Sequence, residues 1–303
     1  MASKCNPLFL DPGSNEYHLD SSLELPPLNV PALLRDYHLS PKKGLGQNFL
    51  VDSSALTELV KVAEIPPEAA VLEVGPGIGS LTRCLAQVSR RVVAVELDEG
   101  LIPLLHKILS AWDNIEIIQG DIMDLDPARI VAEEGYYVVA NIPYYITSML
   151  IRHLLEARIK PARLVLTVQR EVADRICALP GDLSLLALSV QVYGSARPVL
   201  RIPAGSFYPI PKVDSTAVRV DLFSQPAIPV EQLNLFFRLA KAGFSQKRKT
   251  LRNALSAGLH LPAERVEKII SISGIDPRRR AETLSITEWA ELTNSYKSEI
   301  IVN

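Results

Sequence analysis

The middle of the chain alternates short apolar runs with amphipathic segments of helical period. One amphipathic segment at 53–63 predicts a helix that ends before Pro66, and a second follows the glycines near residue 75. The apolar runs that we interpret as strands lie at 69–74, 91–96, 115–119, 137–140 and 164–168. Because strands that alternate with helices pair through right-handed crossovers, this order predicts a parallel sheet with helices on its faces.

The pattern changes toward the carboxyl terminus. A helix, a strand and a helix lead into a proline-rich stretch around 198–211, and 216–222 has the pattern of a last strand. Pro226 and Pro229 mark a linker, and the sequence beyond Val230 has a helical period throughout. The fold class is therefore α/β, with a mostly parallel sheet flanked by helices and a small all-helical C-terminal domain.

Three segments follow from this pattern. Residues 1–40 are rich in Pro, Asn, Ser and Asp without a clear period, and we expect an irregular N-terminal extension there. The α/β domain is expected at 41–225 and the helical domain at 226–303.

Charge is distributed unevenly along the chain. A hydrophobic content of 48% over 303 residues allows a sizeable core, and the net charge of −2 alone argues against nucleic-acid binding. The stretch 241–280, however, holds ten basic and three acidic side chains. Because phosphate affinity depends on the local potential, this stretch predicts a nucleic-acid contact.

The cysteines and the apolar runs indicate where in the cell the protein works. Cys5, Cys84 and Cys177 are far apart, show no metal-ligand spacing and do not indicate a disulfide framework, so we expect no metal and a reducing cytoplasm. The N-terminus lacks the pattern of a signal peptide. The longest apolar stretch, near 183–192, is too short to span a bilayer, so no membrane is expected.

A glycine loop follows the first strand of the predicted sheet. Gly75, Gly77 and Gly79 lie between this strand and a helix, and glycine lets a backbone turn sharply and approach a ligand closely. Glu96 ends the next strand, where a carboxylate can accept hydrogen bonds from ribose hydroxyls. Asp121 follows the third strand at the same sheet edge, in reach of an adenine amine. These residues predict a site for a nucleotide-type cofactor.

The sequence Asn141-Ile142-Pro143-Tyr144 directly follows the fourth strand, where such sheets bind ligands. The exocyclic amine of adenine is a poor nucleophile because its lone pair is delocalised into the ring. The Asn141 side-chain oxygen and the Ile142 carbonyl, aimed by the rigid turn at Pro143, can accept its two hydrogens. Tyr144 can stack on the base. Positioning and electrostatics then suffice for methyl transfer from a sulfonium donor.

Each of these residues also has a structural explanation. The glycines can form a plain strand–helix turn, and Asp121 can be a solvated loop acid or a helix cap. Asn141 can cap a helix while Tyr144 packs in the core. The combination of the glycine loop, Glu96 and Asn-x-Pro-Tyr at a strand end favours the functional interpretation.

The basic stretch contains a short run without acids. Lys247, Arg248, Lys249 and Arg252 are expected on one helix of the C-terminal domain, where they would contact RNA phosphates. The alternative is a solvated charged face, which is the usual role of such runs.

Seven motifs follow one another along the chain. They are Gly44-Leu45-Gly46-Gln47-Asn48-Phe49-Leu50, Leu72-Glu73-Val74-Gly75-Pro76-Gly77, Glu96-Leu97-Asp98, Gly120-Asp121, Asn141-Ile142-Pro143-Tyr144, Phe207-Tyr208-Pro209-Ile210-Pro211-Lys212-Val213-Asp214-Ser215 and Phe244-Ser245-Gln246-Lys247-Arg248-Lys249-Thr250-Leu251-Arg252-Asn253. Together they resemble a known family, the dimethyladenosine transferases of small-subunit ribosomal RNA of the KsgA or RsmA type. The resemblance covers about residues 41 to 285.

The resemblance implies a Rossmann-like, S-adenosylmethionine-dependent methyltransferase domain. It implies dimethylation of two adjacent adenosines in a hairpin near the 3′ end of small-subunit (16S) ribosomal RNA, with a role in ribosome biogenesis. Phe207 would stack on the target adenine opposite Tyr144, whereas without the resemblance a core aromatic beside prolines would be the favoured interpretation. The partner would be this RNA or the pre-small subunit, and we expect a monomer. The implied cofactor contacts are Asn48, Leu50, Gly75, Gly77, Glu96, Asp121 and Asn141.

Three other functions remain open at this point. A large-subunit ribosomal RNA enzyme of the antibiotic-resistance type shares the chemistry, and only the resemblance of the C-terminal region disfavours it. A non-catalytic RNA-binding assembly factor would not need Asn141, Pro143 and Tyr144. A nicotinamide-dependent dehydrogenase usually has a glycine loop in which the third glycine comes one residue later.

Overall fold

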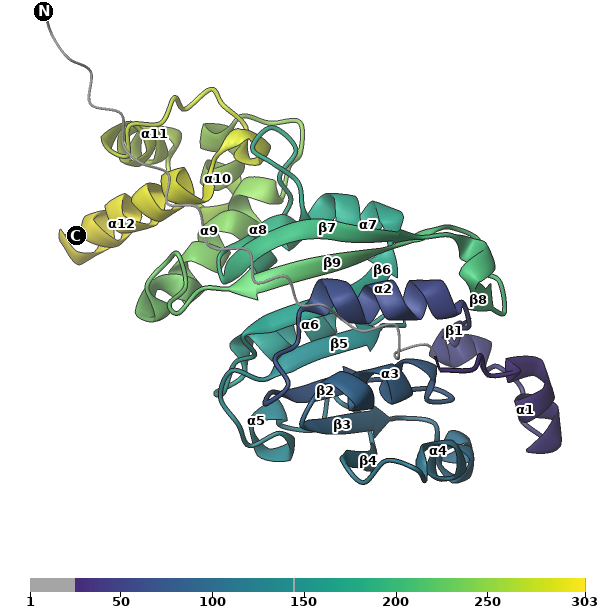
Figure 1. Ribbon diagram of the computed structural model, residues 1–303. Helices are drawn as coiled ribbons and strands as arrows, with labels where there is room; N and C mark the ends of the chain where they lie inside the picture. Colours follow the sequence, from purple (N-terminus) through teal and green to yellow (C-terminus); the bar gives the residue numbers. More distant parts are fainter. Residues whose placement is uncertain (1–24, 144, 303) are drawn as a thin grey trace, which may run out of the picture.

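A seven-stranded sheet forms the centre of the molecule (Figure 1). The structure, a computed structural model, describes residues 25–143 and 145–302. The strands of this sheet are β2 (Ala70–Val74), β3 (Arg91–Glu96), β4 (Ile115–Gln119), β5 (Tyr137–Asn141), β6 (Arg163–Gln169), β7 (Gly194–Ile202) and β9 (Ser215–Leu222). Their order is β4-β3-β2-β5-β6-β9-β7, in which β2 to β6 are parallel and the last two strands are antiparallel to their neighbours.

Helices cover both faces of the sheet. In chain order they are α1 (Val30–Asp36), α2 (Ser53–Ala63), α3 (Ser80–Val88), α4 (Ile102–Leu109), α5 (Pro127–Ile130), α6 (Thr147–Glu156), α7 (Arg170–Ile176), α8 (Leu185–Gln191), α9 (Leu233–Phe244), α10 (Leu251–Leu259), α11 (Ala263–Ile272) and α12 (Ile286–Val302). Successive side chains of a strand point to opposite faces. Val71, Val92 and Val139 accordingly pack with α2 and α3, whereas Leu72 and Val138 pack with α6 and α8.

The predicted α/β class with a mostly parallel sheet is confirmed. The helix at 53–63 and the strands at 91–96 and 115–119 begin and end at the predicted residues. The proline-rich stretch differs from the prediction, because an antiparallel strand, β7, runs through Pro198. β7 lies at the edge of the sheet, and its register shifts between Pro198 and Leu200. An edge position with a bulge tolerates a residue that lacks an N–H donor.

The N-terminal extension was expected to be irregular over 1–40. Residues 1–24 lie outside the described residues, but 30–36 form a helix, α1, which corrects the prediction for that part. The Asn29 side chain caps this helix by accepting a hydrogen bond from the Ala32 amide at 3.1 Å. Buried α1 residues pack with Leu104 of α4. A helix of seven residues is too short to show a clear period.

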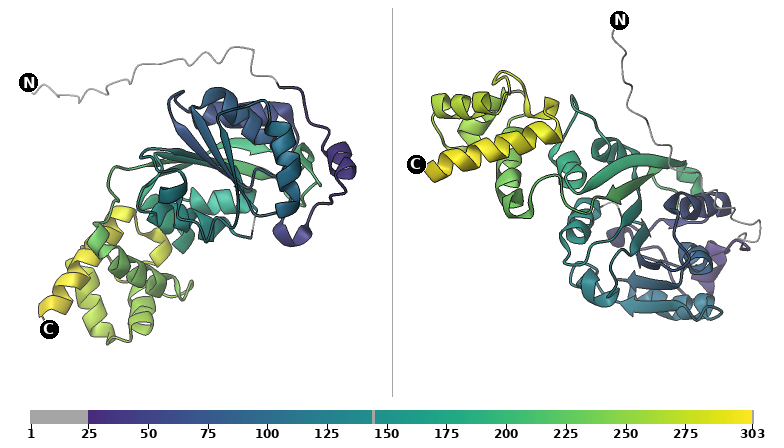
Figure 2. Two further views of the ribbon diagram at one scale, coloured as in Figure 1. Left: turned by 90° about the horizontal axis from the view of Figure 1, so that it is seen from below. Right: turned by 60° about the vertical axis from the view of Figure 1, so that its left-hand side comes forward.

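The C-terminal part of the described chain is helical, as predicted. Figures 1 and 2 show α9 to α12 grouped at one end of the molecule, far from α1. Their buried residues, including Phe236 and Trp289, belong to the same hydrophobic cluster as the sheet residues Leu164 and Val218. The division into two domains near residue 226 therefore stays a prediction, because the packing joins the two parts.

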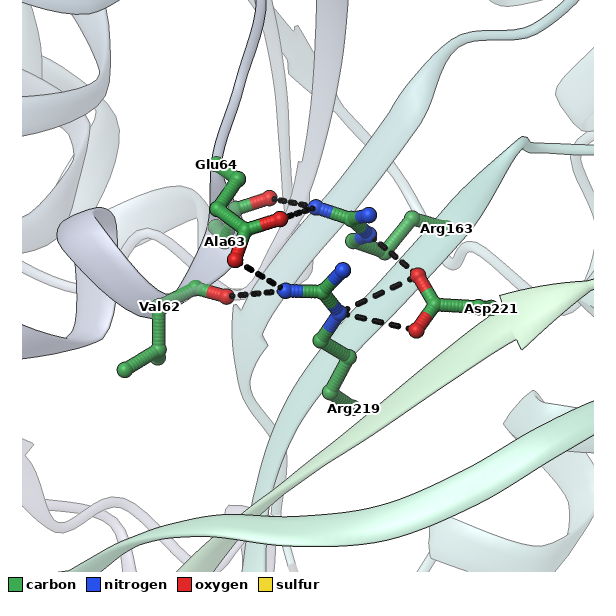
Figure 3. Close-up of polar contacts among 6 residues, drawn as sticks. All are labelled: Val62, Ala63, Glu64, Arg163, Arg219 and Asp221. Atoms are coloured by element: carbon green, nitrogen blue, oxygen red, sulfur yellow. Dashed lines mark hydrogen bonds and ion pairs between the residues drawn. The ribbon is translucent and has the colours of Figure 1, made fainter. Parts of the chain in front are cut away.

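Two arginines fasten α2 to the sheet at the edge where β6 begins (Figure 3). Arg163 donates to the Ala63 carbonyl at 2.8 Å, and Arg219 donates to the Val62 carbonyl at 3.3 Å. Both guanidinium groups also contact Glu64 and Asp221, with Arg219 Nη1 lying 2.7 Å from Glu64 Oε1. The last carbonyls of α2 thus gain the donors that a helix end lacks.

Candidate active site

The carboxyl ends of β2 to β5 surround a cavity of about 290 Å³. This edge of the sheet is the expected ligand site of an open α/β sheet. The cavity brings together residues from five separate sequence segments. All of the predicted cofactor residues line it, namely Asn48, Leu50, Gly75, Gly77, Glu96, Asp121 and Asn141, as does Pro143.

The glycine loop forms one wall of the cavity in a backbone conformation that favours glycine. Gly75 and Gly77 have φ angles of 71° and 61°. A Cβ atom on Gly77 would lie 2.8 Å from the Phe49 ring, so no side chain fits there. A Cβ atom on Gly75 would meet no protein atom within 4 Å, although Gly75 lines the cavity. The loop therefore leaves open space for a ligand beside its backbone.

Glu96 presents a rigidly held carboxylate to the cavity. Its Oε2 accepts a hydrogen bond from the Gly77 amide at 2.9 Å, and its Oε1 accepts one from the Asp98 amide at 2.8 Å. Burial raises the pKa of Glu96, and these backbone hydrogen bonds oppose that effect. Each carboxylate oxygen can accept a second hydrogen bond. The side chain can therefore bind ribose hydroxyls without losing its own support.

Asp121 combines the two interpretations that the sequence left open. One carboxylate oxygen accepts a hydrogen bond from the Met123 amide at 2.9 Å, which is a local turn contact. The residue also lines the cavity. Its second carboxylate oxygen has no hydrogen bond to another described residue.

Glu73 is a cavity residue that the sequence reasoning missed. It lies within β2, only 1% of it is exposed, and burial raises its pKa to about 8. Its Oε2 has no hydrogen-bond partner among the described residues. A lone acid within the buried run 70–74 was the signal, because a charged residue is rarely buried without a function or a partner.

Asn141 ends β5 with its amide held in one orientation. The side-chain Nδ2 donates to the Asn48 carbonyl at 2.8 Å, and no described residue donates to the Oδ1 acceptor of this cavity-lining side chain. Asn141 does not cap a helix, since α6 begins at Thr147. The alternative role as a helix cap is therefore wrong. The neighbouring Pro143 lines the cavity as predicted, and Tyr144 lies outside the described residues.

Phe207 does not line the cavity. It lies in β8 (Phe207–Tyr208), which pairs with β1 (Phe49–Leu50), and 2% of it is exposed. Because strand side chains alternate, Phe207 packs in the core beside α2 and α3, whereas Tyr208 is 37% exposed. Its stacking role stays a prediction. Tyr145, which the sequence reasoning missed, is 53% exposed and lines the cavity.

The basic residues of the C-terminal part are arranged differently from the prediction. Lys247, Arg248 and Lys249 are exposed in the loop between α9 and α10, not on a helix, because the Thr250 side chain caps α10 and the helix begins after it. None of these three side chains has an ion pair among residues 25–143 and 145–302. Arg252 does lie on α10, where it is 2.9 Å from Glu267.

Among residues 25–143 and 145–302, no group of three or more His, Cys, Asp or Glu side chains is placed to hold a metal ion. Within the same residues, no helix combines the length and the apolar character of a membrane span.

Comparison with known proteins relates the chain to one family. The family model described as "Ribosomal RNA adenine dimethylase" matches residues 39–298. A "Ribosomal RNA small subunit methyltransferase A" of Dehalococcoides mccartyi is 43% identical over 267 residues, covering 87% of this chain and 91% of the relative. One of the same name from Geobacillus kaustophilus is 42% identical over 275 residues, covering 87% and 93%.

Two solved structures have a similar fold. A dimethyladenosine transferase from Plasmodium falciparum superposes with a TM-score of 0.70 at 25% identity, covering 83% of this chain and 98% of that one. The 23S rRNA methyltransferase ErmE superposes with a TM-score of 0.68 at 28% identity, covering 82% and 100%. The fold alone thus matches a dimethyladenosine transferase and a 23S rRNA methyltransferase about equally, whereas the higher sequence identities belong to relatives named small-subunit methyltransferases.

Proposed function

The chain belongs to the ribosomal RNA adenine dimethylase family, and on that premise we propose how its residues carry out the reaction of that family. The protein is an S-adenosylmethionine-dependent methyltransferase that dimethylates adenine amines in small-subunit (16S) ribosomal RNA. The observation that carries the mechanism is the position of Asn141. It shares one cavity with the glycine loop and Glu96.

The cavity fits the cofactor in size and in chemistry. Its volume of about 290 Å³ is at the lower end of the range of ligand pockets. We assign Glu96 to the ribose hydroxyls and Asp121 to the adenine amine. The backbone at Gly75 and Gly77 can pack closely against a ligand, and loop residues such as Asn48 cover it.

When bound, S-adenosylmethionine supplies a methyl group on a positively charged sulfur. Asn141 Oδ1 accepts one hydrogen of the adenine amine, and the Ile142 carbonyl accepts the other. The hydrogen bond to Asn48 keeps the Asn141 amide from turning its NH₂ group toward the substrate. Pro143 makes the turn rigid, and Tyr144 stacks on the base. These contacts draw the lone pair onto nitrogen and align it with the methyl group.

We assign the RNA target from the family resemblance and the charge distribution. Two adjacent adenosines in a hairpin near the 3′ end are the substrate, in the pre-small subunit. Phosphate contacts come from the exposed loop residues Lys247, Arg248 and Lys249 and from Arg252 on α10. The enzyme acts as a monomer in the cytoplasm, and the free thiols of Cys84 and Cys177 are compatible with a reducing compartment.

The test is transfer of tritium from labelled S-adenosylmethionine to ribosomal subunits of a strain that lacks the modification. Label is expected in adenosines near the 3′ end of the small-subunit RNA, with up to two methyl groups on each. Label in large-subunit RNA alone would support the antibiotic-resistance type. Binding of small-subunit RNA without transfer would instead indicate an assembly factor.

A further inference from the structure

A short loop, residues 42–48, lies against the cavity on the side of the cofactor residues. Its residues Leu45, Gly46, Gln47 and Asn48 line the cavity, whereas Lys42 does not. The loop is braced internally, because the Lys42 amide donates to Gln47 Oε1 at 2.7 Å and the Gly46 amide donates to the Lys43 carbonyl at 3.0 Å. It can therefore move as a unit.

One buried carboxylate fastens this loop on the cofactor side. Asp98 is 4% exposed, and its Oδ1 accepts from Lys42 Nζ at 2.6 Å while its Oδ2 accepts from Gln47 Nε2 at 2.8 Å. The Asp98 amide in turn donates to Glu96 Oε1 at 2.8 Å. Asp98 thus contacts the loop through its carboxylate and the proposed ribose acceptor, Glu96, through its backbone amide.

The loop is also fastened on the side of the target base. The Asn48 carbonyl accepts the hydrogen bond from Asn141 at 2.8 Å. The Tyr145 ring packs over Gly46, where an added Cβ atom would be 3.4 Å from Tyr145 Cδ1. One segment therefore contacts both halves of the proposed reaction site.

We propose that Lys42, Gln47 and Asp98 form a latch that holds residues 42–48 closed over bound S-adenosylmethionine, with Lys42 as a positioning residue. This inference rests on the proposed function. Lys42 acts only through the loop, because it does not line the cavity. Its side chain is 53% exposed, so salt screens its attraction to Asp98 and weakens the latch.

The latch predicts a specific change in cofactor affinity. Lys42→Met is expected to raise the dissociation constant and the KM for S-adenosylmethionine by about three- to tenfold, as loss of one partly exposed charge-assisted hydrogen bond should. The kcat at saturating cofactor and the melting temperature should stay near the wild-type values. Lys42→Arg should restore affinity. Lys43→Met is the matched control, because Lys43 is adjacent, exposed and without an ion pair among the described residues.

Calorimetric titration of the full chain with S-adenosylmethionine measures the affinity without RNA, so it separates the latch from the proposed methyl transfer. Rising salt should weaken binding in the wild type more than in Lys42→Met. Gln47→Leu should also weaken the binding of S-adenosylmethionine. Equal affinities for Lys42→Met and Lys43→Met would overturn the latch. A fall in melting temperature and kcat at unchanged KM would also overturn it, because that result describes a purely structural contact.

Discussion

The side-chain amide of Asn141 donates a hydrogen bond to the backbone carbonyl of Asn48, 93 residues earlier in the chain, at 2.8 Å. The bond joins the end of β5 to the loop that lines the cofactor side of the cavity. It uses the NH₂ end of the amide, so the oxygen remains as an acceptor for the substrate. A structural contact thereby fixes which end of the Asn141 amide can face the proposed substrate.

Asn141→Ala is expected to lower the rate of methyl transfer by on the order of a hundredfold or more while the fold is kept. The oxygen that it removes binds the amine more strongly as charge develops on nitrogen, so the loss falls on the chemical step. Single-turnover methylation at saturating RNA and cofactor measures the effect, and circular dichroism checks the fold.

Asn141→Asp provides the matched control for orientation. The carboxylate keeps an acceptor oxygen, but it cannot donate to Asn48 and places a negative charge beside that carbonyl. We expect a rate between those of the wild type and Asn141→Ala. If Asn141→Ala transfers methyl groups at nearly the wild-type rate, the Asn-x-Pro-Tyr turn has only a structural role.

Glu96→Ala is expected to weaken binding of S-adenosylmethionine by roughly 1.5–3 kcal/mol, the usual contribution of a charge-assisted hydrogen bond. Glu96→Gln keeps one acceptor oxygen, so its affinity for S-adenosylmethionine should lie between those of the wild type and Glu96→Ala. The control is Glu99→Ala, because Glu99 is exposed three residues later. Calorimetry gives the affinities, and filter binding of RNA should be unchanged. Wild-type cofactor affinity in Glu96→Ala would remove the ribose assignment.

The parallel part of the fold could be predicted from sequence because buried strands and amphipathic helices have distinct periods. Strand β7 could not, since prolines normally indicate irregular structure and only the edge position of the strand makes Pro198 tolerable. Helix α1 is too short to show a period. The structures of both β7 and α1 depend on the elements that they pack against, which the local sequence does not show.

That Gly75, Glu96, Asp121 and Asn141 line one cavity could be predicted, because strand ends in a parallel sheet meet at one edge. The latch at Asp98 could not, because its partners Lys42 and Gln47 are more than fifty residues away in sequence. The residues around Phe207 alone favoured a core aromatic beside prolines, and its 2% exposure agrees with that interpretation, whereas its pairing partner β1 could not be predicted. Long-range contacts of this kind leave no local pattern.

Changing Lys247, Arg248 and Lys249 together to Ala is expected to weaken RNA binding and to reduce the salt dependence of the binding constant. Each lost phosphate contact should lower the slope against salt by roughly one. Lys268→Ala is the control, because Lys268 is exposed on α11 beside the acidic Glu267. Salt titration of binding to small-subunit RNA is the measurement. An unaltered slope in the triple variant would mean that this loop faces solvent in the complex.

Arg219→Met is expected to lower the free energy of unfolding by about 1–3 kcal/mol, because it leaves the carboxylates of Glu64 and Asp221 with fewer donors. The hydrogen bond from Arg219 lowers the pKa of Glu64. That contribution is present above the unfolded pKa near 4.5 and is lost as pH falls through the lower folded value. The difference in the free energy of unfolding between the wild type and Arg219→Met should therefore become smaller in acid.

Urea unfolding across pH tests this role, with Arg201→Met as the control. Arg201 is 66% exposed in its pair with Asp214, so its loss should cost less. The network lies at the sheet edge where β6 begins, whereas the cavity lies at the carboxyl ends of β2 to β5, so methyl transfer by folded Arg219→Met should be retained. Equal stabilities of the two variants at neutral pH would contradict the proposed role of Arg219.

The burial of Glu73 should make stability fall as pH rises, which is opposite to the effect expected from Glu64. Its pKa is about 8 in the folded protein, against an ordinary value of 4.5, chiefly because burial penalises the charged form. Between these two values the folded protein holds a proton that the unfolded chain has released. The contribution of Glu73 to stability is therefore fully present below the unfolded pKa, and it is lost as pH rises toward the folded pKa.

Glu73→Gln removes this titration while keeping the size of the side chain, so its unfolding free energy should change less with pH than that of the wild type. The slope in the wild type approaches about 1.4 kcal/mol per pH unit between the two pKa values, so the curves should separate progressively as pH rises. Urea unfolding at several pH values measures both slopes, and Glu68→Gln, at an exposed acid just before β2, is the control. The variant should be the more stable protein on the alkaline side, because an amide can remain buried where a carboxylate must ionise. Parallel curves for wild type and Glu73→Gln would show that folding does not raise the pKa of Glu73.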